Sequence, residues 1–225
     1  PDNSLAHRTT WLRSDLEIHV NYKKLQSLDT LILDRVAEIG RGYNFSSKDE
    51  SDTGEYQVIR ITDLTETGID YTKLISVNPR QVDLSSYLVQ KGDILLSVRG
   101  STNKVELIED GHDKLLVHAN LVSLRVGAGY DEHFLKLYLE SSLGQILLTT
   151  LARGTTVKQI SIQDLRLLPV PNLSLARQQE IVASYQRKKL QVEQKLAAIR
   201  REERDIQHDF YDATGMGEAF EIEEG

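Results

Sequence analysis

The stretch LARGTTVKQISIQDLRLLPVPNLSLARQQEIV, from Leu151 to Val182, decides how this chain folds. It leads from a polar turn that contains a glycine into a short apolar strand, and then through two prolines into a long charged helix. Pro169 and Pro171 interrupt regular structure and favour an extended backbone. Ser174 can then cap a helix in which neither proline nor glycine recurs before Gly215. The stretch predicts a compact domain that leads into a rod.

The part of the chain before this stretch alternates short apolar segments with turn residues. The strand candidates are VIRITDL, ILLSVRG, KVELIE and NLVSLRV, which are rich in Val, Ile and Leu and are bounded by Gly, Asp or Asn. One helix is predicted from Glu132 to Leu151, with Asp131 as its cap and a kink at Gly144. This mixture predicts an α+β domain around a twisted sheet.

The sequence divides into four predicted regions. Residues 1–27 form an N-terminal arm that holds the only tryptophan, Trp11. Residues 28–173 form the globular domain, and residues 174–210 form the long helix. Residues 211–225 form an acidic tail that is predicted to be disordered.

The predicted helix carries apolar residues at a spacing of three and four. Lys189 and Glu203 fall on the same stripe and interrupt it. A heptad seam of about four repeats predicts a coiled coil, in which polar seam positions fix the register. The alternative is an amphipathic helix that folds back on its own domain. The residues predicted to mediate self-association are Ile181, Tyr185, Val192, Leu196, Ile199 and Ile206, and Phe210 continues the stripe.

The charge of the chain is compatible with nucleic-acid binding but does not indicate it. The net charge is −7, whereas nucleic-acid binders usually present a basic surface. Seven acids and no Lys or Arg follow Arg204, so residues 1–204 sum to zero. Between Leu151 and Arg204, eleven Lys or Arg stand against five acids, a local surplus of six. A solvated helix face followed by an acidic tail would give the same distribution.

Composition limits the class of protein. The chain has 225 residues and no cysteine, so disulfides and thiolate metal sites are excluded. No apolar run approaches the ~18 residues that a membrane span needs, and no signal peptide opens the chain. These features predict a cytoplasmic globular protein. The chain begins at Pro1 without an initiator methionine, which leaves open whether it is a complete protein or a fragment of a longer one.

Three arginine–glycine pairs are the strongest binding candidates, because each is followed by a hydroxyl or an aromatic residue. Glycine lets the backbone approach a phosphate, and arginine can contact phosphate or the O6/N7 edge of guanine. The alternative for each pair is an ordinary turn with an exposed arginine. Arg60, inside a strand candidate, points at DNA or pairs with Asp63. The predicted DNA contacts are Arg41, Tyr43, Arg60, Arg99, Ser101, Thr102, Lys104, Arg153, Thr155, Thr156, Lys158 and Gln159.

Four pieces of sequence occur in an order that resembles one protein family. The first three are DRVAEIGRG at Asp34–Gly42, YQVIRITDL at Tyr56–Leu64 and KGDILLSVRGS at Lys91–Ser101. The fourth runs from Gly154 through G-T-T-x-K-Q-I-S and D-L-x-x-L-P-V-P to Q-Q-E-I-V. Together they resemble the target recognition domain of the specificity subunits of type I restriction–modification systems.

This resemblance implies a non-catalytic subunit that recognises a sequence in double-stranded DNA. It would position a methyltransferase subunit, and a nuclease subunit as a further partner, on that sequence. Gln178 and Gln179 resemble the family's glutamine at this helix start, where packing or hydrogen bonding of the rod to the domain is expected. The family usually carries two such domains joined by two antiparallel helices, whereas this chain shows one copy. It is therefore either a half-subunit that dimerises through its helix or the recognition module of a larger polypeptide.

No catalytic residue, metal site or cofactor is predicted. Asn78-Pro79-Arg80 lacks the second proline and the aromatic ring of an adenine methyltransferase loop, and no GxGxxG or Walker loop occurs. The six histidines form no HxxxH or HxH pair. The rival hypothesis is a target recognition domain cut from a fused type II methyltransferase or endonuclease. A DNA mimic is disfavoured, because the acidity is confined to the tail. The target bases cannot be inferred from these residues.

Overall fold

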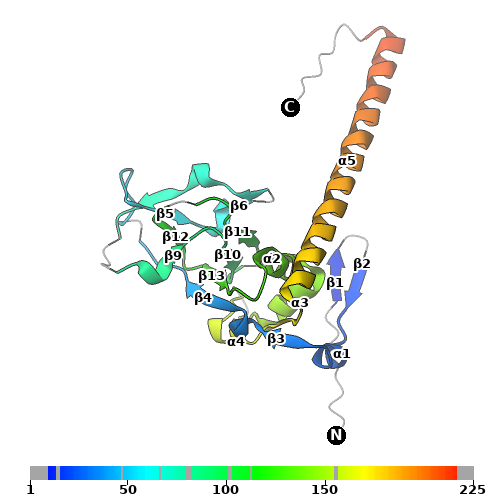
Figure 1. Cartoon of the computed structure of the whole chain (residues 1–225). Coiled ribbons are helices and arrows are strands. Elements are labelled where there is room, and N and C mark those ends of the chain that lie inside the picture. The colour runs from blue at the N-terminus through cyan, green and yellow to red at the C-terminus, as the bar shows by residue number, and fades with distance from the viewer. Residues whose placement is uncertain are drawn as a thin grey trace. The chain divides into compact units, whose positions relative to one another are not determined.

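The computed structural model describes residues 10–13, 16–46, 48–65, 67–79, 83–100, 103–111, 113–154 and 157–216 (Figure 1). The chain divides into two compact units, one ending at Gln179 and the other beginning at Glu180. Each unit is described on its own. Among the described residues, the first unit holds all the strands and four of the five α-helices, and the second holds most of α5.

Two four-stranded sheets form the centre of the first unit. The first sheet has the order β11-β10-β13-β4 and is antiparallel throughout. The second has the order β8-β5-β12-β9, in which β12 and β5 run parallel. The α+β fold class is confirmed, with the strands divided between two sheets. The bounds of the first sheet are β11 Val105–Leu107, β10 Ile94–Ser97, β13 Leu121–Val126 and β4 Ala37–Arg41; those of the second are β8 Ile75–Val77, β5 Tyr56–Ile59, β12 Leu115–Val117 and β9 Leu88–Val89.

Successive residues of a strand point to opposite faces of its sheet. The core therefore lies both between the two sheets and beside them. In β12, Leu115 and Val117 join a cluster that also contains Leu95 of the first sheet. The intervening Leu116 joins a second cluster, with Val58 of β5 among its members. The side chains of the three-residue strand β12 therefore belong to two separate hydrophobic clusters.

Short elements complete the first unit. A hairpin forms from β1 (Thr10–Arg13) and β2 (Leu16–His19), and a smaller one from β6 (Leu64–Thr65) and β7 (Gly68–Ile69). Helix α1 spans Tyr22–Gln26, and α4 spans Ile162–Arg166. Single 3-10 turns occupy Leu33–Arg35, Ile61–Asp63, Tyr71–Lys73 and Ser85–Tyr87.

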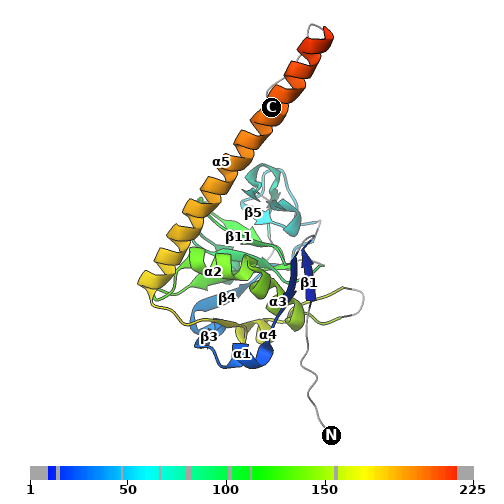
Figure 2. The same ribbon diagram turned by 90° about the vertical axis from the view of Figure 1, so that its right-hand side faces the viewer.

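The predicted helix from Glu132 to Leu151 is two helices. Helix α2 spans Glu132–Glu140 and packs against β11 of the first sheet, and α3 spans Ser142–Leu151 (Figure 2). Asp131 caps α2 as predicted, since its side chain accepts from the N–H of Phe134. The break lies at Ser141, which has an extended backbone and caps α3 through the N–H of Gly144.

Gly144 acts through close approach rather than as the kink itself. A Cβ at this position would lie 2.1 Å from the carbonyl oxygen of Tyr138, so only glycine lets α3 start so near the end of α2. The prediction that the helix bends at Gly144 was therefore wrong by three residues, because Ser141 ends one helix and begins the next.

The two prolines form the extended segment that the sequence predicts. Strand β14, Pro169–Pro171, pairs antiparallel with β3, Thr30–Ile32. Proline cannot donate a ladder hydrogen bond, but both proline carbonyls are used as acceptors. The hydroxyl of Tyr138 donates to Pro169 at 2.6 Å, and that of Tyr130 donates to Pro171 at 2.9 Å. Burial raises the pKa of Tyr138 to about 12, which keeps its hydroxyl protonated as a donor.

Helix α5 spans Leu175–Thr214, so it begins next to the predicted cap and ends four residues beyond the predicted Phe210. The N–H of Arg177 donates to Ser174 Oγ at 3.4 Å. Residues 217–225 of the predicted acidic tail lie outside the described part of the chain. No helix among the described residues is long and apolar enough to cross a membrane.

Gln178 fixes the first turn of α5. Its side chain is fully buried, accepts from the N–H of Asp131 at 2.8 Å and donates to the carbonyl of Leu173 at 2.8 Å. Gln179 is exposed. One glutamine of the pair therefore joins the helix start to the capping residue of α2.

Replacing Gln178 with alanine should lower the free energy of unfolding by about 1 to 3 kcal/mol, because two polar groups lose their partner. Replacing the exposed Gln179 with alanine is the matched control and should change it by less than about 0.5 kcal/mol. Urea unfolding followed by circular dichroism measures both. Equal effects of the two variants would contradict the assigned role of Gln178.

Candidate nucleic-acid interface

Two arginine–glycine turns that lie far apart in the sequence meet in the first unit. Arg153 and Gln159 exchange both backbone hydrogen bonds at 2.9 Å and close a small loop. The far side of this loop pairs with the turn after β10, where the N–H of Gly100 donates to Lys158 at 3.2 Å. The N–H of Ile160 donates to Val98 at 2.9 Å. Backbone pairing thus brings residues 98–100 beside residues 153–160.

The convergence produces an exposed, positively charged surface. Arg99, Arg153, Lys158 and Gln159 are all exposed, and we refer to these four residues as the arginine–glycine surface. Arg99 Nε donates to Gln159 Oε1 at 3.1 Å, which orients both side chains. Arg153 forms an ion pair with Asp164 at 3.1 Å but remains 80% exposed. Such an exposed pair is weak and can be exchanged for another anion.

Gly154 is required by the shape of the loop. It has φ +116°, and a Cβ there would lie 2.5 Å from the carbonyl oxygen of Val157. A side chain would be strained and would also clash. Glycine is therefore required next to the exposed Arg153. Thr155 and Thr156, predicted contacts in the same loop, lie outside the described residues, as do Ser101 and Thr102.

His118 interacts with Arg99 of this surface and contacts Phe45, and neither residue was predicted from the sequence. Burial lowers the pKa of His118, and the charges of Arg99 and Arg60 lower it further. Phe45 packs edge-on against His118, with ring centroids 5.3 Å apart. A backbone bridge between Tyr43 and His118 places them together. No local motif announces such a contact, because the residues belong to distant segments.

Tyr43 does not lie on the predicted face. Its side chain is buried in the core, packs edge-on against Tyr87 at 5.3 Å and has its pKa raised by burial. The burial of Tyr43 does not support the predicted DNA contact, because the residue after the Arg41-Gly42 turn points into the molecule.

Arg60 pairs with Asp63 in two hydrogen bonds of 3.1 and 3.2 Å and also donates to the carbonyl of Lys73. The Asp63 side chain is only 2% exposed, so this arginine compensates a buried carboxylate. Of the two alternatives for Arg60, the structure shows the pair with Asp63.

Lys104 is also engaged within the fold. Its ammonium donates to the carbonyls of Ile61 and Leu64, and its backbone N–H donates to Ser97 Oγ. A lysine that satisfies two carbonyls has little freedom to reach a phosphate. Arg41 is exposed at the end of β4, where it lines a cleft with Ser85 and Arg125. It is not among the residues whose backbone hydrogen bonds build the arginine–glycine surface.

The lysine–glycine–aspartate turn at the start of β10 is structural. Asp93 is buried and holds Arg125 of β13 through two hydrogen bonds of 2.7 and 2.9 Å. It also accepts from the N–H of Gln90 at 2.9 Å. The motif therefore fixes two neighbouring strands of the first sheet and leaves no free carboxylate for chemistry.

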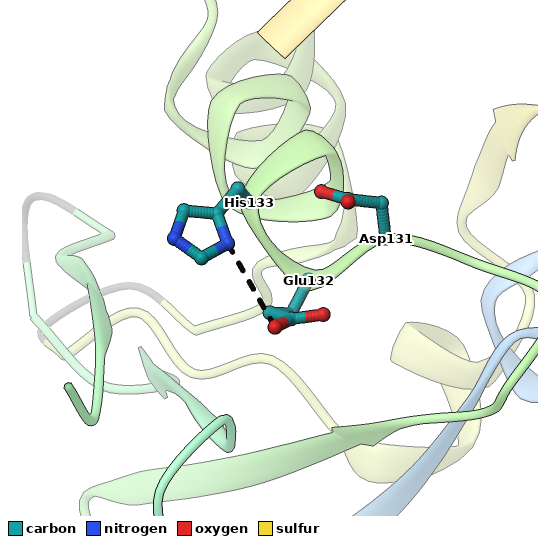
Figure 3. A group of neighbouring side chains, drawn as sticks. All are labelled: Asp131, Glu132 and His133. Carbon is teal, nitrogen blue, oxygen red and sulfur yellow. Dashed lines mark ion pairs between the residues drawn. The ribbon is translucent and has the colours of Figure 1, made fainter. Parts of the chain in front are cut away.

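Asp131, Glu132 and His133 are close enough to be considered as metal ligands (Figure 3). His133 Nδ1 lies 3.8 Å from a carboxylate oxygen of Glu132. Asp131, however, already accepts from the N–H of Phe134 as the helix cap. Three consecutive side chains at one helix start, with one committed to the cap, do not indicate a metal site.

Comparison with known proteins gives a consistent picture. Residues 29–194 match the family model described as "Type I restriction modification DNA specificity domain". No curated protein matches the chain. The chain is similar to a structure whose title concerns complex assembly and conformational transition of the type I R-M system. The TM-score is 0.58 and the sequence identity is 20%, and the match covers 82% of this chain and 43% of that one.

Two further structures are similar. The HsdS subunit from Thermoanaerobacter tengcongensis has TM-score 0.54 and 22% identity, covering 76% of this chain and 38% of that one. A type I S subunit from M. genitalium has TM-score 0.49 and 21% identity, covering 78% and 43%. At these identities the likeness to the structures with TM-scores above 0.5 concerns the fold, and the chain spans about two fifths of their length.

Replacing Arg60 with alanine should lower the free energy of unfolding by about 1 to 3 kcal/mol, because the buried Asp63 loses a charged partner. This expected loss of stability is smaller than for a fully buried ion pair, because the Arg60 side chain is 35% exposed. Arg41→Ala, an exposed arginine, serves as the control in thermal unfolding. Unchanged stability of the Arg60 variant would show that the pair with Asp63 is not structural.

Replacing Arg99 with alanine should raise the pKa of His118 toward its usual 6.5, because removing a neighbouring positive charge makes protonation easier. A proton NMR titration of the histidine ring measures the shift. Arg153→Ala is the control and should leave this pKa unchanged. A pKa that is insensitive to Arg99 would place the arginine away from His118.

Proposed function

Because the chain belongs to the family of type I restriction–modification DNA specificity domains, we propose that it reads a specific sequence in double-stranded DNA. In this role it positions a methyltransferase subunit, and a nuclease subunit where one is present, on the target. The proposal that it is a non-catalytic specificity component is supported by family membership.

The observation that carries the proposal is the arginine–glycine surface. Two segments separated by more than fifty residues meet through backbone pairing, and the side chains that result are exposed and mostly cationic. A cluster with only a structural role would be expected to compensate buried acids, as Arg60 and Arg125 do. Arg99 and Lys158 have no such partner among the described ion pairs.

The four side chains can divide the work of recognition. Arginine can hydrogen-bond to O6 and N7 of guanine, and glutamine to N6 and N7 of adenine. Arg99 and Gln159 are held together by a hydrogen bond of 3.1 Å, so they can approach neighbouring base pairs as a unit. Lys158 suits a phosphate contact, which positions the protein without reading sequence. Arg153 can leave Asp164 for a guanine or a phosphate.

Helix α5 supports the proposed assembly. Its apolar stripe, including Val192, Leu196 and Ile199, is exposed in the single chain. A helix that leaves an apolar stripe in water is expected to bury it against another helix. A second copy of this chain and the methyltransferase subunit are both candidate partners for this stripe.

Binding to a target selected from a random duplex library tests the proposal. Affinity should fall as the salt concentration rises, with a slope of log affinity against log salt of about −0.9 for each phosphate contact. Arg99→Ala should reduce preference for the selected sequence by about 1 to 3 kcal/mol. Lys158→Ala should instead weaken binding to all sequences and reduce the slope by about one.

The matched control is Arg35→Ala, an exposed arginine in a 3-10 turn outside the surface, which should bind like the parent. Fluorescence anisotropy at several salt concentrations separates the two kinds of effect. A salt slope near zero, or variants that all bind like the parent, would contradict DNA recognition by this surface.

A further inference from the structure

A polar cleft lies where the two sheets of the first unit meet. It is bordered by β4 and β13 of the first sheet and by the turn that leads into β9 of the second. Its volume is about 310 Å³. Ligand pockets usually hold about 300 to 1,000 Å³, so this cleft suits a small, compact group. Among the residues that line it are Glu38, Gly40, Arg41, Ser123 and Arg125.

Gly40 opens the floor of the cleft. The backbone does not require a glycine here, because Gly40 is not among the described glycines with a positive φ. A Cβ at this position would lie 2.4 Å from Ser123 Oγ and would displace that hydroxyl. A glycine inside a strand weakens the strand and often marks the close approach of a ligand. Gly40 therefore leaves room beside a hydroxyl on the face that β4 and β13 share.

The Ser123 hydroxyl borders this room. The residue is only 8% exposed and lies directly opposite Gly40 in the ladder between β4 and β13. Its side chain forms no hydrogen bond with any part of the chain that the structure describes. A buried hydroxyl without a hydrogen bond is costly. One that opens onto a cleft therefore indicates a partner that enters the cleft.

A carboxylate and a guanidinium stand beside this floor. Glu38 and Arg125 are exposed partners in the same ladder, two positions from Gly40 and Ser123, so all four side-chain positions share one face. Within the described residues the two form no ion pair with each other. Arg125 instead holds the buried Asp93 through Nε at 2.9 Å and one terminal nitrogen at 2.7 Å.

The charges of the cleft favour a neutral ligand. Arg125 is compensated by Asp93. Arg41, which has no ion pair among the described residues, is balanced in charge by Glu38. An anion such as a phosphate would meet the Glu38 carboxylate and be repelled by it. The cleft therefore suits a neutral group that carries hydrogen-bond donors and acceptors together.

We propose that this cleft binds a guanine base. The N1–H and N2 amino groups of guanine are adjacent donors, which one carboxylate accepts together, and Glu38 supplies that carboxylate. O6 and N7 are adjacent acceptors, which an arginine contacts as a pair. Arg41 has its guanidinium available for them, and Ser123 supplies one further hydrogen bond.

The other DNA bases match these groups less well. Cytosine offers a single amino group to a carboxylate, and adenine offers an amino group that lies between two acceptors. Thymine has a single N–H between two carbonyls. Guanine alone combines two adjacent donors with two adjacent acceptors.

The base has two possible sources that present the same edges. One is a DNA strand from which the base has turned out of the helix, and the other is a free guanine nucleoside or nucleotide. The first source rests on the proposed function, whereas the second does not depend on it. The arginine–glycine surface takes no part in either.

Titration of the full chain with nucleosides tests the cleft without DNA. Guanosine should shift the NMR signals of the amides at Glu38–Arg41 and Ser123–Arg125. Inosine lacks the N2 amino group and 7-deazaguanosine lacks N7. Each should bind roughly tenfold more weakly than guanosine, because a hydrogen bond to a charged group is lost.

Variants of the cleft assign the contacts. Glu38→Gln should weaken guanosine binding roughly tenfold and largely remove the preference over inosine, which a merely structural role would not change. Gly40→Ala should abolish binding, because the added methyl group displaces the Ser123 hydroxyl and fills the floor. Glu50→Gln is the matched control, since Glu50 is exposed and does not line the cleft. The amide spectrum checks that each variant is folded.

Three results would overturn the proposal. They are no binding of guanosine, equal binding of guanosine, inosine and cytidine, or a Glu38→Gln variant that discriminates between guanosine and inosine as the parent does.

Duplexes that carry one unpaired guanine or one unpaired adenine identify the source of the base. Tighter binding of the unpaired guanine by the parent, but not by Gly40→Ala, assigns the base to DNA. Equal binding of the two duplexes, with guanosine binding intact, assigns the cleft to a free nucleoside or nucleotide. Binding of the selected, fully paired target and its loss in Arg99→Ala are measured on the same chain. Failure of the proposed function therefore leaves the nucleoside result standing, and failure of nucleoside binding leaves DNA recognition standing.

Discussion

The candidate DNA surface depends on a few backbone hydrogen bonds between residues 98–100 and residues 153–160. Arg99 lies in the turn that follows β10, and Arg153 lies in the turn that follows α3. Without these hydrogen bonds, nothing would hold the two turns together. The pairing of Arg153 with Gln159 closes the loop, and the bonds to Gly100 and Val98 attach it. Because backbone groups do this work, the exposed side chains remain available for a ligand.

The sequence motifs and the candidate reading residues have different roles. Asp93 of the lysine–glycine–aspartate turn holds Arg125, and Asp63 holds Arg60, so both aspartates join strands or turns within the fold. Gln178 joins α5 to the cap of α2. The motifs that carry the family resemblance therefore describe how this domain is built. Specificity is expected from exposed side chains such as Arg99, which the fold presents but does not require.

Much of the fold could be predicted from local patterns. Apolar runs and turn residues predicted the strands β10 and β13, and the capping residues Asp131 and Ser174 predicted two helix starts. Pairing between distant segments could not be read in this way. The division into two sheets and the burial of Tyr43 follow from such pairing. So does the contact of Phe45 with His118, which no periodicity reveals.

Hydrogen–deuterium exchange with and without the selected DNA target tests the central claim most directly. DNA should slow exchange at the amides around Arg99–Gly100 and at those of Val157–Gln159, because both segments form one surface. Peptides from β3 and β14, which lie outside it, should exchange as in the free chain. Protection confined to other segments, or of only one of the two, would contradict a DNA surface built by their convergence.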